Sequence, residues 1–142
     1  MHPSSKIANR LLDLAEAQGV QLTPMKLINL VYLAHGWMLG LCGRPLIRDE
    51  VQAWKHGPVI PALYKDVRTF RSGPVVGRLA VSDNGPLDPD EEDIIRQTFE
   101  NYARKSAAYL SALTHQSGSP WAQTCRINML IRRHEFKNGS AS

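Results

Sequence analysis

Histidine and cysteine are the residues of this sequence best suited to bind a metal, and their spacing argues against a metal site. No two of the five histidines are three to five residues apart, and neither cysteine has a cysteine or histidine at ligand spacing. Zinc sites usually show such pairs. We therefore expect no bound metal and no cofactor, and we interpret both thiols as reduced core residues. The residues concerned are His2, His35, His56, His115, His134, Cys42 and Cys125.

Catalytic patterns are equally weak. Cys42 lies at the end of an apolar helical segment, where a buried thiol is a better interpretation than a nucleophile paired with His35 or His115. No Gly-x-Ser-x-Gly elbow surrounds Ser117, and no glycine-rich phosphate loop is present. The carboxylates between Asp88 and Asp93 are typical of a helix start rather than an acid–base pair. The residues predict that the protein is not an enzyme.

The clearest structural signals are helix boundaries in the first half of the chain. We expect a first helix to begin after Ser4 or Ser5, either of which could cap it, and to end at Gly19. A second helix should begin with Thr23 as cap and Pro24 at the first position. Its apolar residues recur at helical spacing and form a wide face, so it should be the buried centre of the fold. The recurring set is Leu27, Leu30, Val31, Ala34, Trp37, Met38 and Leu41.

The middle and the end of the chain predict shorter elements. Residues 50–54 alternate like a strand, residues 61–70 should form a helix, and residues 75–82 could be a second strand that pairs with 50–54. A helix should follow the cap Asp88, another should run from Ser106 to near Gln116, and a last one should occupy residues 127–136. We expect a mainly α, compact single-domain fold of about five to six helices with one small two-stranded β element.

Composition sets the broad class of the protein. The 142 residues carry a net charge of +4, with 43% hydrophobic and 21% charged residues, which suits one globular domain spanning residues 1–142. Its core should cover about residues 5–136, with 137–142 as a flexible tail. The N-terminus lacks the apolar run of a signal peptide, and we found no apolar stretch of membrane-spanning length. These features predict a soluble, cytoplasmic protein with no membrane partner.

DNA binding is an alternative that the residues leave open but do not favour. The first two helices resemble the opening of a winged-helix domain, and residues 75–85 could be its wing. A recognition helix should expose several polar or basic residues near its start. The second helix offers only Lys26 and Asn29 there. The third offers Lys65 and Arg68 late, and Arg71 at its end.

Three landmarks in the sequence resemble those of the Panacea domain, the SocA-like antitoxin family. The first is Leu-Thr-Pro-Met-Lys-Leu at residues 22–27, with Tyr32 following, and the second is Ala-Trp-Lys-His-Gly-Pro-Val at residues 53–59, with Leu-Tyr at 63–64. The third is Leu-Thr-His at residues 113–115, followed by Pro-Trp at 120–121. Asn29 stands where the family commonly has lysine, and His56 where it often has tyrosine. The resemblance covers about residues 7–136.

Membership would imply a non-enzymatic antitoxin that neutralises a cognate protein toxin by direct binding. Some relatives are linked to delivering a toxin to a protease, and others are phage-associated proteins, so a phage protein that binds a host factor is a further alternative. The toxin would be encoded by an adjacent gene. Basic residues such as Lys55, Arg68 and Arg71 would speed the encounter with an acidic partner. By this resemblance we predict partner contact at Trp54, Lys55, His56, Gly57, Pro58, Tyr64, His115 and Trp121. From the residues alone, packing is favoured over interface contact for the aromatic members.

Overall fold

A computed structural model describes residues 1–55, 57–83 and 85–115. It confirms a mainly α fold with one two-stranded sheet. In chain order the elements are α1 (Ser4–Gln18), α2 (Pro24–Cys42), β1 (Gln52–Trp54), β2 (Gly57–Val59), α3 (Pro61–Val67), the 3-10 turn η1 (Arg68–Phe70), α4 (Pro89–Tyr102) and α5 (Ala107–His115). The helix expected at residues 127–136 lies outside the described residues.

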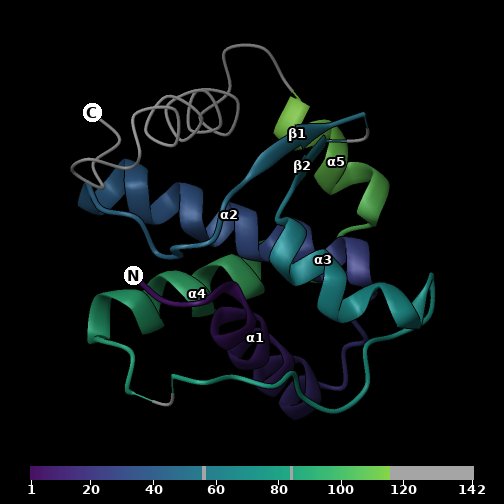
Figure 1. The fold of residues 1–142 in the computed structure, drawn as a ribbon, viewed down its shortest axis with the longest axis horizontal. Coiled ribbons are helices and arrows are strands. Elements are labelled where there is room, and N and C mark those ends of the chain that lie inside the picture. The colour runs from purple at the N-terminus through teal and green to yellow at the C-terminus, as the bar shows by residue number, and fades with distance from the viewer. Residues whose placement is uncertain (56, 84, 116–142) are drawn as a thin grey trace.

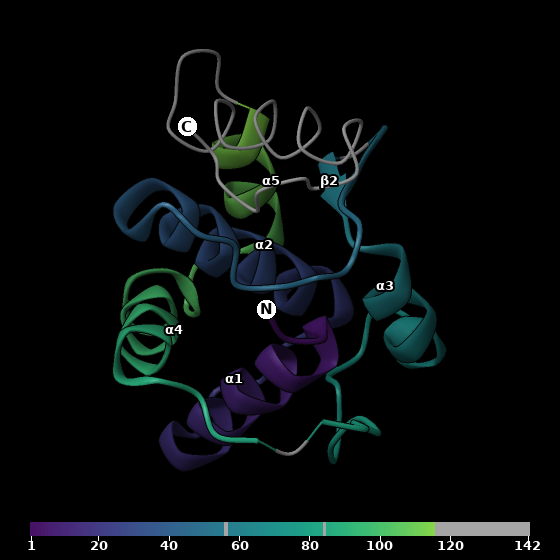
Figure 2. The same ribbon diagram turned by 60° about the vertical axis from the view of Figure 1, so that its left-hand side comes forward.

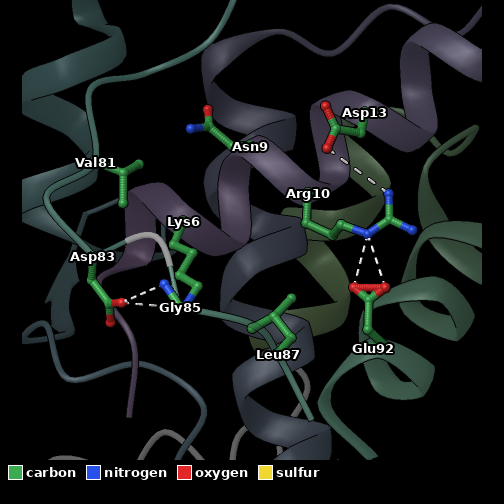
Figure 3. A pocket seen from close by; sticks show the side chains of 9 residues that line it. All are labelled: Lys6, Asn9, Arg10, Asp13, Val81, Asp83, Gly85, Leu87 and Glu92. Atoms are coloured by element: carbon green, nitrogen blue, oxygen red, sulfur yellow. Dashed lines mark hydrogen bonds and ion pairs between the residues drawn. The ribbon is translucent and has the colours of Figure 1, made fainter. Parts of the chain in front are cut away.

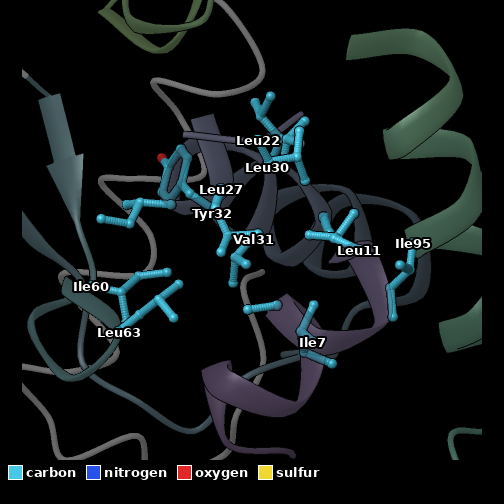
Figure 4. Packing of buried hydrophobic residues seen from close by; sticks show 14 of the residues in the cluster. Ile7, Leu11, Leu22, Leu27, Leu30, Val31, Tyr32, Ile60, Leu63 and Ile95 are labelled. Atoms are coloured by element: carbon cyan, nitrogen blue, oxygen red, sulfur yellow. The ribbon is translucent and has the colours of Figure 1, made fainter. Parts of the chain in front are cut away.

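Helix α2 is the centre of the molecule, as its wide apolar face predicts. Every residue from Leu27 to Gly36 is buried. A helix buried on all sides must have neighbours on all sides, and α2 contacts α1, α3, α4, α5 and β2. Figures 1 and 2 show it crossing the middle of the fold, with α3 and α4 on opposite sides. Figure 4 shows its side chains meeting those of the surrounding elements.

The predicted caps of α2 and α4 are confirmed. Thr23 accepts a hydrogen bond from the Lys26 backbone N–H at 3.4 Å, and α2 starts at Pro24. Asp88 and Glu91 form a reciprocal capping box at the start of α4. Each cap satisfies backbone N–H groups that have no partner inside the helix.

The predicted cap of α1 is wrong, although its predicted end at Gly19 is confirmed. The helix starts at Ser4 itself, and the preceding Pro3 has no side-chain acceptor. The missing acceptor comes from Asp49, whose Oδ2 accepts from the Ser4 backbone N–H at 2.7 Å and also from the Ser4 hydroxyl. A residue far along the chain therefore caps α1.

The predicted pairing of residues 75–82 with residues 50–54 is also wrong. Strand β1 pairs antiparallel with β2, with Gln52 opposite Val59 and Trp54 opposite Gly57. A two-residue connection closes at much lower entropic cost than a connection of about twenty residues. Residues 75–82 instead form a non-strand segment along α1. The Asn9 side chain of α1 bonds both backbone groups of Leu79. Asn9 Nδ2 donates to the Leu79 carbonyl at 2.9 Å, and the Leu79 N–H donates to Asn9 Oδ1 at 2.8 Å.

Cys42 departs from its predicted buried position. It is the last residue of α2 and is exposed. The helix passes beyond the covered part of the core over its last turn, where Gly40 and Leu41 are exposed as well.

Candidate functional site

The β1–β2 hairpin and helix α3 bring two of the predicted aromatic residues together. Trp54 ends β1, and Tyr64 lies in the first turn and a half of α3. Their ring centroids are 5.5 Å apart with planes at 69°, which is an edge-to-face contact. Trp54 is 43% exposed and Tyr64 is 37% exposed. Both side chains are therefore packed on one side and open to solvent on another.

Polar contacts along β1 hold the indole in place. Trp54 Nε1–H donates to Gln52 Oε1 at 2.8 Å, and Gln52 Nε2 donates to Glu50 Oε1 at 2.8 Å. Alternate residues of a strand project to the same side, so these three side chains form one row. The indole therefore has a hydrogen-bond partner for its N–H and packs against the Tyr64 ring, while Trp54 stays 43% exposed.

Gly57 and Pro58 have a different role from the aromatics. Both are buried, and they form β2 with Val59. Gly57 adopts φ 122°, in the region that only glycine occupies comfortably. Their predicted contribution to partner binding can therefore act only through the shape of the hairpin.

Three other predicted site residues lie at the limits of the described structure. His56 and Trp121 lie outside the described residues. His115 is the last residue of α5, and this helix packs against β2 (Figure 1). The helix that carries the Leu-Thr-His part of the third sequence landmark therefore lies beside the hairpin that carries the second.

Four basic residues lie on α3 and η1 or directly after β1 and η1. Lys55, Lys65, Arg68 and Arg71 are exposed, and among the described residues their side chains form no ion pair or hydrogen bond. We call the surface made by Trp54, Lys55, Tyr64, Lys65, Arg68 and Arg71 the hairpin–α3 face. Residues 52–73 hold these four Lys and Arg residues and one carboxylate, Asp66.

A hollow lies away from this face, between α1, the segment 79–87 and α4, with a volume of about 450 Å³ (Figure 3). Each of its charged side chains takes part in an ion pair. Arg10 Nε donates to both carboxylate oxygens of Glu92 at 2.8 and 3.0 Å, and Lys6 Nζ is 3.6 Å from Asp83. Within the described ranges, no three His, Cys, Asp or Glu side chains gather as metal ligands.

The acidic residues at the start of α4 are structural, as their sequence pattern indicates. The Glu91 backbone N–H holds the pKa of Asp88 below its ordinary value. Burial opposes ionisation of Glu91, but the Asp88 backbone N–H and His2, whose Nε2 lies 2.9 Å from Oε1, together lower its pKa. Two carboxyls with lowered pKa values hold no proton to donate near neutral pH, so they are unsuited to act as general acids.

The structure does not support the winged-helix interpretation. The described residues between 75 and 85 contain no strand, so they provide no wing. Of the two candidate recognition helices, α2 is buried on all sides over most of its length, and α3 carries its basic Lys65 in its last turn rather than near its start.

Helix α2 is also the one described helix whose length and composition would allow it to span a membrane. Of its most apolar window, 67% is buried within the fold. That burial is typical of the core helix of a globular domain, which passes the same composition test.

Comparison with known proteins identifies two similarities. Residues 27–122 match the family described as "Antitoxin SocA-like, Panacea domain". The chain is also 34% identical over 124 residues to "Antitoxin SocA" of Caulobacter vibrioides (strain NA1000 / CB15N), an alignment that covers 81% of this chain and 66% of the relative. The chain thus spans about two thirds of the length of that curated relative. No solved structure matches significantly.

Proposed function

This chain belongs to the SocA-like antitoxin family, the Panacea domain, and from that premise we propose that it is an antitoxin that binds a cognate toxin directly through the hairpin–α3 face. The binding would block the toxin by occlusion, without catalysis or a cofactor, in the cytoplasm. The toxin would be the product of an adjacent gene.

The half-exposed Trp54–Tyr64 pair is the observation that carries this proposal. Trp, Tyr and Arg are the residues most enriched among those that dominate protein–protein binding energy. Here the Trp ring is already held by Tyr64 and Gln52 before any partner arrives. Because these side chains lose little freedom on binding, the entropic cost of association is reduced.

The first experiment is co-expression of this chain with the product of the adjacent open reading frame, scored by growth and by co-purification. We expect a neighbour that is toxic alone, harmless together with this chain, and recovered with it as a stable complex. A harmless neighbour that does not co-purify would overturn the proposal and favour a DNA target or a host factor.

Mutation of Trp54 and His56, in the second sequence landmark, tests which surface binds. Trp54→Ala or His56→Ala should weaken rescue from the toxin, while the far-UV circular dichroism and the melting temperature stay near those of the wild type. Arg96→Gln, an exposed substitution on α4, should leave rescue unchanged. If the Trp54→Ala and His56→Ala proteins unfold, the second landmark is structural rather than a binding surface.

The toxin could be neutralised by occlusion or by delivery to a protease, and a further experiment separates the two. The half-life of the toxin with and without this chain distinguishes the two. An unchanged half-life alongside restored growth supports occlusion. A shortened half-life would show that proteolysis contributes.

A further inference from the structure

Arg71 has a backbone conformation that arginine strongly disfavours. Its φ is 55° and its ψ is −119°, and it is the one non-glycine residue with positive φ among the described residues. The Gly73 backbone N–H donates to Phe70 O at 2.9 Å, which closes a turn with Arg71 at its first central position. These angles define a type II′ turn, in which that position is normally glycine.

No side-chain contact within the described part of the chain offsets this backbone strain. The Arg71 side chain is exposed, and it forms no ion pair or hydrogen bond there. Strained residues of this kind cluster at functional sites, where the side chain is needed in a fixed place. Arg71 directly follows η1, seven residues after Tyr64 of α3.

The charges of the molecule are unevenly paired, which indicates what such an arginine would contact. The ion pairs among the described residues join the N-terminal segment, α1, Arg44, residues 78–83 and α4. None involves a residue of the hairpin, α3 or η1. Lys55, Lys65, Arg68 and Arg71 are therefore available to carboxylates of another molecule.

We propose that Arg71 is a partner-recognition residue, and that the hairpin–α3 face binds an acidic protein surface with Arg71 as its charged anchor at one end and the Trp54–Tyr64 pair as its apolar anchor at the other. This inference rests on the proposed function and specifies the chemistry of the partner. A protein is favoured over a nucleic acid because an exposed aromatic pair and a carboxylate, Asp66, lie among the basic residues.

The test uses two substitutions that separate strain from charge. Arg71→Gly removes both the side chain and the strain, whereas Arg71→Gln removes the charge and keeps the strain. Both should weaken the complex with the neighbouring gene product by about tenfold. Arg71→Gly alone should raise the melting temperature of the isolated protein, by about 2–5 °C.

Two controls complete the design. Arg96→Gln removes an exposed arginine from α4, on the opposite side of α2 from α3 (Figure 2), and should bind like the wild type. Arg71→Glu should abolish binding, and a reciprocal Glu→Lys change in the partner's contact surface should restore part of it. The association rate of the wild-type complex should fall with added salt, less so for Arg71→Gln.

The outcomes distinguish this inference from the proposed function. If the complex forms and Arg71→Gln binds with unchanged affinity, the inference is overturned and the proposed function stands. If no complex forms, the proposed function fails, and the inference fails with it. If Arg71→Gln instead weakens binding to a 20-base-pair DNA duplex while the protein complex is unaffected, the face is a nucleic-acid surface. An Arg71→Gly protein that melts below the wild type would refute the strain argument independently of any partner.

Discussion

Asp49 shows how a single side chain can complete an element far from it in sequence. The first N–H of α1 has no acceptor within its own helix, as in every α-helix, and the preceding Pro3 has no polar side chain to supply one. Asp49 provides that acceptor and places a negative charge at the positive end of the helix dipole. The loop after α2 is thereby attached to the start of α1.

We expect Asp49→Ala to lower the free energy of unfolding by about 1 kcal/mol, the usual effect of losing a helix cap. Asp49→Asn keeps an acceptor oxygen and should lose less. Urea denaturation of the two variants measures the difference. Equal stability of Asp49→Ala and the wild type would mean that solvent caps α1 as well as Asp49 does.

At the residue scale, sequence reasoning predicts what depends on neighbours in the chain. The half exposure of Trp54 and Tyr64 follows from the adjacent glycine and prolines, whereas the contact between Asp49 and Ser4 joins distant residues. The strain at Arg71 is invisible in the sequence because an arginine there gives no sign of positive φ. The exposure of Cys42 differs from its predicted burial because an apolar helix end does not show in the sequence how far the core extends.

The segment 75–82 is the element whose character the sequence does not predict. Its β-branched residues favour a strand, but β2 already pairs with β1. Its backbone is anchored instead by a side chain, since the Asn9 amide satisfies both polar groups of Leu79. Arg78 adds ion pairs to Asp13 at 2.7 Å and Glu16 at 3.1 Å. The segment is a strap held along α1.

Asn9→Ala should release this strap from α1. Two hydrogen bonds are lost, and we expect the free energy of unfolding to fall by about 1–3 kcal/mol. Faster hydrogen exchange at the Leu79 amide should accompany the loss, with little change at amides of α2. Arg78→Ala is the matched comparison, because it removes exposed ion pairs and one exposed hydrogen bond to the neighbouring Gly77 carbonyl, and it should change stability by less than about 1 kcal/mol. Unchanged exchange at Leu79 in Asn9→Ala would contradict this account.

Helices were more predictable than the strap because their signals are local. Thr23 followed by Pro24, and Asp88 followed by Pro89, each place cap and first helical residue side by side in the chain. A strand depends on a partner whose position the sequence does not state. The two-stranded sheet was predicted, but residues 57–59 form its second strand instead of 75–82.

At the scale of the whole molecule, the paired charges link the N-terminus to α4. His2 contacts Glu91, and Arg44 bridges from the end of α2 to Asp88 at 2.9 Å and Glu91 at 3.3 Å. Lys6 Nζ lies 3.1 Å from the other ring nitrogen of His2, Nδ1. His2 therefore lies between Lys6 and Glu91, with one ring nitrogen facing each.

Acid should destabilise the fold through these carboxyls. The pKa of Glu91 is lower in the folded protein than its ordinary 4.5, so the unfolded chain binds its proton more readily. The stability that this shift provides is present above about pH 4.5 and is lost as the pH falls through the folded-state pKa. Glu91→Gln should flatten the acid limb of a plot of melting temperature against pH, and the exposed Asp90→Asn should not. An unchanged acid limb in Glu91→Gln would contradict the assignment.

The N-terminal segment is held by contacts with later parts of the chain, and this has a consequence for biosynthesis. Helix α1 is translated first, but its cap is residue 49, its ion-pair partner Glu92 follows 43 residues after that cap, and the strap that covers it comes between the two. At ordinary ribosomal speeds those 43 residues take roughly 2–9 s to appear. During that interval the amphipathic helix has no complete set of neighbours, so a nascent chain is exposed to proteases and chaperones. If translation stopped abruptly, the supply of newly folded protein would therefore fall first. The molecules already folded would be affected only later.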